Sequence, residues 1–186
     1  MKSSEQYPEG TFELLLRFNT GERVGQSAVN WAVSALGEGY DSPSLRVLAG
    51  LDVDNQATTE EALQLVDATF QELGLKRPDL DTTARWYVCE VATAVVAGGL
   101  PPREAANKIH RLVMTPMDHP KDLMAWCYVW EGNAADCSRP LDESEWDREI
   151  LKVAMQYASV ALKRPQAKAS HSIVGKIFRS LRPGRD

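Results

Sequence analysis

The chain has 186 residues and a formal net charge of −5, with 44% hydrophobic and 25% charged residues. This length and composition are typical of one globular domain and exclude a wholly disordered chain. No apolar run reaches the roughly 18 residues that a membrane-spanning helix needs, and the N-terminus lacks the apolar core of a secretory signal. The three cysteines, Cys89, Cys127 and Cys137, are widely separated and odd in number. Because a disulfide framework needs paired cysteines, we expect a reducing, cytoplasmic location.

Charge is distributed unevenly along the chain. From Lys163 onward there are seven basic residues and one acidic residue, a net charge of +6, so residues 1–162 carry −11. An acidic body of this kind should repel nucleic acid and anionic membranes unless the tail alone makes the contact.

The tail ends in a short basic amphipathic segment, and three interpretations of it stay open. It can be a solvated end, it can bind an anionic membrane or nucleic acid phosphate, or it can dock on the acidic body of this chain or of a neighbour. The candidate contact residues are Lys176, Phe178, Arg179 and Arg182.

Taken in chain order, apolar residues recur at helical spacing nearly throughout, and no strand alternation or long repeat is convincing. The first apolar stretch, residues 10–18, fits a helix, although a strand is possible at that length. The spacing predicts further helices over residues 26–37, 43–51, 58–73, 82–97, 102–113, 119–131 and 142–161.

The stretch "GYDSPSLRVLAGL", residues 39–51, is interpreted as a helix-loop-helix connection rather than a ligand-binding loop. Glycine favours the left-handed conformation that ends a helix, Ser42 can cap the next helix, and Pro43 fits its first position. Asp41 and Arg46 are then expected to form a salt bridge that pins the turn. Both residues are also candidates for a polar network or an interaction site.

These patterns predict an all-α domain of about seven helices, bundle-like or orthogonal, over residues 8–164. Residues 1–7 are expected to be a flexible N-terminus, and residues 165–186 a basic linker and amphipathic tail. Helix 82–97 is apolar on most of its circumference, which is typical of a central helix. Within it, Glu90 must either reach solvent or pair with a cation, because an unpaired buried carboxylate would be neutralised.

Motifs for metal or catalytic chemistry are weak. The acidic run at residues 52–61 fails as a calcium loop, since Ala57 and Leu63 stand where glycine and glutamate are required. No Cys-x-x-Cys or His-x-x-x-His pair is present, although His119 could still meet Cys127 and Cys137 across a loop. Because free cysteines in apolar helices usually act as small hydrophobic residues, we expect no metal, no cofactor and no catalytic residue.

Two elements together are similar to part of a known group of sequences. The stretch "GYDSPSLRVLAGL", followed by "TFQELGLKRPD" and "VAGGLPPREAANKIHRL", resembles small all-helical bacterial proteins of unknown function. These proteins carry a Gly-x-Asp-Ser/Thr-x-x-Leu-Arg-x-Leu-Ala-Gly-Leu element, and the resemblance covers about residues 26–130. It implies a bacterial, cytoplasmic, helical domain and transfers no reaction or binding residue.

The sequence is compatible with two functions. The first is a non-catalytic interaction module whose acidic surface binds another protein, for instance a basic one, with exposed Trp130 as an anchor. The alternative is a small enzyme or ligand-binding domain whose site is assembled from distant residues. A polar pocket that holds Glu90 or Asp41 would favour this alternative.

Overall fold

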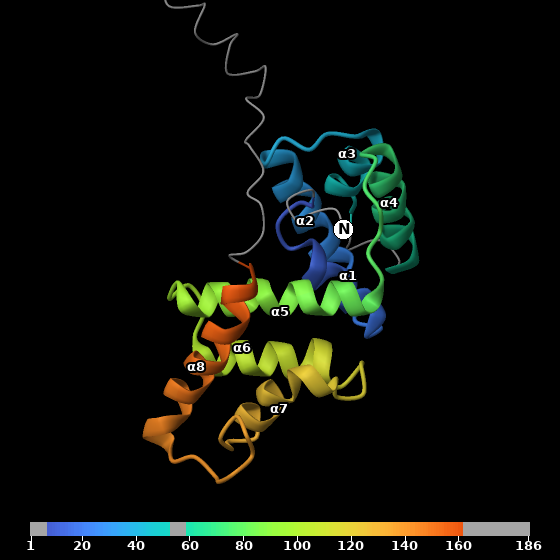
Figure 1. Ribbon diagram of the computed structural model, residues 1–186. Helices are drawn as coiled ribbons and strands as arrows, with labels where there is room; N and C mark the ends of the chain where they lie inside the picture. The colour runs from blue at the N-terminus through green and yellow to red at the C-terminus, as the bar shows by residue number, and fades with distance from the viewer. Residues whose placement is uncertain (1–6, 53–58, 162–186) are drawn as a thin grey trace, which may run out of the picture.

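The computed structural model describes residues 7–52 and 59–161 (Figure 1). The predicted all-α class is confirmed: the described residues form eight α-helices, one more than about seven, with no strand among them. The candidate tail contacts Lys176, Phe178, Arg179 and Arg182 lie outside the described residues. None of the helices in the described ranges is long and apolar enough to cross a membrane.

Two irregular turns separate α6 from α7. The elements are α1 Thr11–Asn19, α2 Gly25–Gly37, α3 Pro43–Ala49, α4 Thr59–Glu72, α5 Leu80–Val96, α6 Pro102–Ile109, the π-helical turn η2 His110–Met114, the 3₁₀ turn η3 Lys121–Leu123, α7 Met124–Trp130 and α8 Glu143–Ala161.

Local capping explains several of the helix boundaries. The Ser42 side chain accepts a hydrogen bond from the Leu45 N–H, and Pro43 is the first residue of α3, as predicted. The helix predicted to open at Asp81 or Thr82 begins at Leu80 instead. Its cap is Asp79, whose carboxylate accepts from the Thr82 N–H at 2.7 Å.

Two apolar clusters form the core, and α1 lies between them. One cluster joins α1 to α5, α6, α7 and α8, and the other joins α1 to α2, α3 and α4. Within α1, Phe12 and Leu16 belong to the first cluster, while Leu14 and Leu15 belong to the second. Figure 1 shows the same division: α5 runs between α1–α4 and α6–α7, and α8 crosses α5. The prediction that the apolar helix is central is therefore confirmed.

The helical spacing in α2 predicts an inward face that contains Val29, Ala32, Val33 and Leu36, with Trp31 inward as well. Ala32 and Trp31 are buried as predicted, together with Ala28 and Ala35, whereas Val33 is 55% exposed. Trp31 decides the orientation, because its ring stacks with Phe70 and its N–H donates to the Thr11 hydroxyl at 2.9 Å. Burying a tryptophan removes far more apolar surface from water than burying a valine.

Candidate metal-binding site

His110 lies where α6 gives way to the π-helical turn. The Thr115 N–H donates to the His110 carbonyl at 3.1 Å, a bond across five residues that marks this turn. The turn accommodates three consecutive buried residues, Leu112, Val113 and Met114, which a regular α-helix would direct to different sides. His110 is thereby left half-buried at the edge of the larger core cluster.

His119 is brought back toward His110 by a tight turn. Asp118 and His119 both have left-handed backbones, with φ of 53° and 55°. Residues other than glycine rarely adopt this conformation, and it is found preferentially at functional sites. The His119 N–H donates to the Met114 carbonyl at 2.8 Å, which ties the turn to the end of the π-helical segment.

Helix α7 supplies the third side chain and its surroundings. Cys127 is buried on the face of α7 that meets the two histidines, and its thiol donates to Glu131 Oε1 at 3.8 Å. Trp130 stacks on the His110 ring with 3.5 Å between ring centroids and 9° between planes. This stacking holds the imidazole plane in one orientation.

A ligand atom from each of His110, His119 and Cys127 lies within 4.8 Å of the other two. In a tetrahedral zinc site with ordinary bond lengths, such atoms are about 3.3–3.6 Å apart. The three side chains would therefore have to approach one another by at most about 1.5 Å to bind one ion. His119 is exposed, so an ion can reach the group from solvent.

The surroundings of His110 favour its neutral form. Burial lowers the pKa of His110 below its ordinary value, nearby His119 lowers it further, and Glu131 opposes both effects. Burial likewise raises the pKa of the Cys127 thiol, and Glu131 and Cys137 add to that increase. The imidazole is thus ready to donate a lone pair, whereas the thiol must lose its proton to become a ligand.

The residues proposed from the sequence are distributed over the molecule. Asp41 and Arg46 form the expected salt bridge, with Arg46 Nε 2.7 Å from Asp41 Oδ1, and both are exposed. Glu90 is half-buried and lines a cavity between α1, α5 and α6. Trp130 is 36% exposed and stacks on His110 of the histidine-cysteine group.

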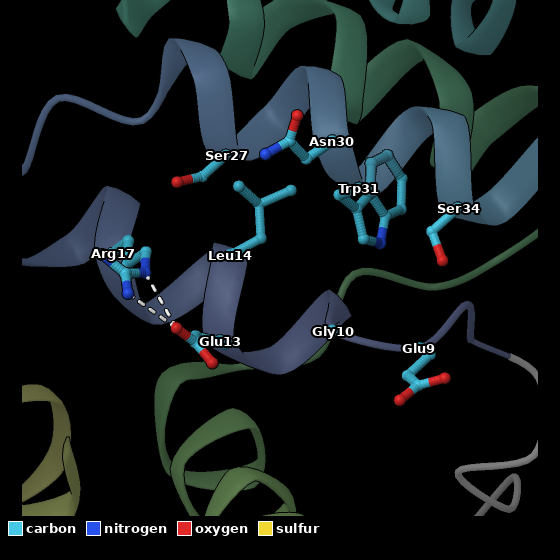
Figure 2. Close-up of a pocket in the computed structure, with 9 residues that line it drawn as sticks. All are labelled: Glu9, Gly10, Glu13, Leu14, Arg17, Ser27, Asn30, Trp31 and Ser34. Atoms are coloured by element: carbon cyan, nitrogen blue, oxygen red, sulfur yellow. Dashed lines mark hydrogen bonds and ion pairs between the residues drawn. The ribbon is translucent and has the colours of Figure 1, made fainter. Parts of the chain in front are cut away.

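A second hollow lies on the other side of α1, against α2, with a volume of about 340 Å³. Figure 2 shows Glu13 and Arg17 paired along α1, with Ser27 and Asn30 on the neighbouring turns of α2. Its lining mixes polar and apolar side chains, and it contains no group of metal ligands among the described residues. The histidine-cysteine group is therefore the better candidate for a specific site.

Sequence reasoning considered His119 with Cys127 and Cys137 and did not include His110. The structure brings His110 into the group, whereas Cys137 lies exposed in the following loop. One local signal was available: Cys127 and Glu131 are four residues apart, so both fall on one face of a helix. The nine-residue separation of the two histidines matches no familiar ligand spacing.

Comparison with known proteins gives no significant match among protein-family models, curated proteins or solved structures. The resemblance of residues 26–130 to small all-helical bacterial proteins therefore stays a prediction. What can be inferred about function rests on the geometry of this chain alone.

Proposed function

We propose that this protein binds one zinc ion through His110, His119 and Cys127. The observation that carries the proposal is the convergence of three strong ligand types, from three separate elements, within 4.8 Å of one another. This corresponds to the alternative in which a site is assembled from residues distant in the sequence.

The chemistry of the donors favours zinc over calcium or magnesium. Two imidazole nitrogens and one thiolate suit a borderline-soft ion, whereas calcium and magnesium prefer sets of oxygen ligands. Copper would compete for the same donors in vitro, because divalent copper binds nitrogen and sulfur sites more tightly than zinc does. Zinc is proposed because it readily accepts the four-coordinate geometry that these side chains can form.

Glu131 is proposed as the fourth ligand. Its carboxylate accepts a hydrogen bond from the Cys127 thiol, and zinc binding would replace the thiol proton with the metal. Two anions left 3.8 Å apart would repel each other unless the cation lay between them. Glu131 also stands at the C-cap of α7, where the helix dipole disfavours a carboxylate, so a bound cation would offset this cost.

The proposal is tested by zinc titration of the full chain against a chromophoric chelator, after removal of metal with EDTA. We expect one zinc ion per chain, and at least tenfold weaker binding for His110→Ala, His119→Ala and Cys127→Ser. Cys89→Ala is the matched control, because Cys89 is a buried cysteine on α5 outside the group. Equal affinity in the wild type and Cys127→Ser would overturn the proposal.

Cobalt substitution then identifies the fourth ligand. A cobalt-thiolate charge-transfer band should appear in the wild type and disappear in Cys127→Ser. Glu131→Gln is expected to weaken zinc binding, and Cys137→Ser is expected to leave both zinc affinity and the cobalt spectrum unchanged. If instead Cys137→Ser weakens binding and reduces the thiolate band, Cys137 rather than Glu131 completes the site.

The interaction with a basic protein through an acidic surface stays a prediction. It does not conflict with zinc binding, because a bound metal can serve a purely structural role next to an interaction surface.

A further inference from the structure

A groove of about 630 Å³ lies between α1, α5 and α6, apart from the histidine-cysteine group. Apolar side chains from the second half of α5 and the turn after it form one wall: Val91, Ala94, Ala97 and Leu100. Ala94 and Leu100 are half-buried and Ala97 is exposed, so this wall leaves apolar surface in contact with water. Because removing apolar surface from water is favourable, the wall suits an apolar partner.

Two charged side chains of the groove already pair within the chain. Glu13 Oε2 lies 3.8 Å from Lys108 Nζ, and Glu13 Oε1 lies 2.7 Å from Arg17 Nη2. A charged ligand would have to displace these partners, and exchanging one ion pair for another at a surface gains little free energy. The apolar wall therefore decides what kind of partner fits.

The last described helix ends beside this groove. Tyr157, one turn before the end of α8 at Ala161, donates a hydrogen bond to the Asp122 carbonyl, and the Asp122 carboxylate pairs with Arg85 of α5. One turn further along α5 is Cys89, which lines the groove. Burial raises the pKa of Tyr157, and Arg85 and Cys89 also act on it, which agrees with this placement. The chain beyond Ala161 therefore starts next to the groove.

Residues 162–186 lie outside the described residues, and their sequence has the properties that the groove requires. Ile173, Ile177 and Leu181 recur every four residues, which forms one apolar stripe if the segment is helical. A helix this short is not stable alone in water, so it needs an apolar surface to pack on.

Length and charge also favour docking on the same chain. Residues 162–172 can span up to about 40 Å when extended, whereas α5 from Cys89 to its end at Val96 is about 10 Å long. The tail from Lys163 onward carries +6 and residues 1–162 carry −11, so the tail is attracted to the body.

We propose that residues 173–181 dock as a short amphipathic helix in this groove of the same chain, with the apolar stripe against the apolar wall. Lys176 and Arg179 then lie on the opposite side of the helix, toward solvent. The proposal does not depend on zinc binding, because the groove shares no residue with the histidine-cysteine group.

The test compares backbone amide spectra and heteronuclear NOEs of the full chain, in EDTA, for the wild type, Ile177→Glu and Gln166→Glu. We expect Ile177→Glu to lower the docked population at least about tenfold, because it places a charge in the apolar stripe. The amides of residues 89–100 should then shift, and the NOEs of residues 173–181 should fall. Gln166→Glu is the matched control, since it adds the same charge outside the segment. Equal changes in both variants, or no change at residues 89–100, would overturn the proposal.

A second pair of variants tests the groove itself. Ala97→Glu adds a charge to the wall, whereas Val96→Glu adds one at a neighbouring position, 44% exposed, that does not line the groove. We expect the NOEs of residues 173–181 to fall in Ala97→Glu and to stay at the wild-type value in Val96→Glu. Equal losses would show a general effect on the end of α5 and overturn the assignment.

The same spectra distinguish the other occupants and targets. Wild-type amide positions at residues 89–100 that change on dilution would show that the tail binds a second copy. Ordering of residues 173–181 that appears only with phosphatidylserine vesicles would assign the tail to an anionic membrane. Either result would overturn docking within one chain.

Discussion

Trp130→Ala should weaken zinc binding although Trp130 has no atom that could bind the metal. Its indole stacks on the His110 ring at 3.5 Å between centroids, which limits the orientations that this imidazole can adopt. An aromatic pair of this kind contributes about 0.5–1.5 kcal/mol beyond the surface that it buries. If that free energy holds His110 in its ligand orientation, the zinc dissociation constant should rise about 2- to 13-fold in Trp130→Ala. Trp130→Phe keeps a ring over the imidazole and should lose less.

The assay is the same chelator competition, accompanied by cobalt spectra and by urea unfolding in EDTA. Cobalt bands at unchanged wavelengths would show that the ligand set is intact and that only its positioning has been lost. Trp86→Ala is the matched control: Trp86 is a partly buried tryptophan on α5 that stacks on Phe12 instead. It should lower the free energy of unfolding without changing zinc affinity. The reasoning is refuted if Trp130→Ala binds zinc as tightly as the wild type, or if Trp86→Ala weakens binding equally.

Ile150→Ala is expected to lower the free energy of unfolding, measured by urea denaturation, by about 2–5 kcal/mol, because Ile150 is fully buried in the larger core cluster on α8. A loss below about 1 kcal/mol would contradict that packing. Tyr87→Phe should leave the free energy of unfolding unchanged or raise it, since the hydroxyl that it removes has no partner among the described residues. Hydrogen bonds from the Ser44 N–H and hydroxyl lower the pKa of Glu72 below its ordinary value of 4.5. The stability that this link between α3 and α4 contributes is therefore present above pH 4.5 and lost as the pH falls further, and Glu72→Gln should remove that part of the pH dependence.

Helices whose ends carry local signals could be predicted from the sequence. Ser42 and Pro43 act within one turn of the residues that they affect, so α3 begins where the sequence indicates. The Asp41–Arg46 salt bridge is equally local, spanning five residues. In both cases the contact that fixes the structure joins residues at most five positions apart in the sequence.

The inward face of α2 could be predicted only in part: Trp31 is buried as expected, whereas Val33 is exposed. Two stripes, one through Val33 and one through Trp31, have nearly the same helical period and similar apolar content. The choice depends on Phe70 and Thr11, which lie on other helices. Helical periodicity restricts the candidate faces, and tertiary partners select among them.

Among the three proposed metal ligands, only His110 was missed, and for a related reason. His110 stands at the first residue of a π-helical turn, and His119 has a left-handed backbone. Both are places where the regular α-helical pattern fails, so helical periodicity does not place His110 beside His119 and Cys127. Local irregularities of this kind cost free energy and persist only where surrounding contacts maintain them. Here the buried run Leu112–Met114 maintains the π-helical turn, and the bond from His119 to the Met114 carbonyl maintains the return of the chain. The same contacts that make the segment irregular therefore bring the two imidazoles to Cys127, so zinc would stabilise the segment that departs most from regular helix.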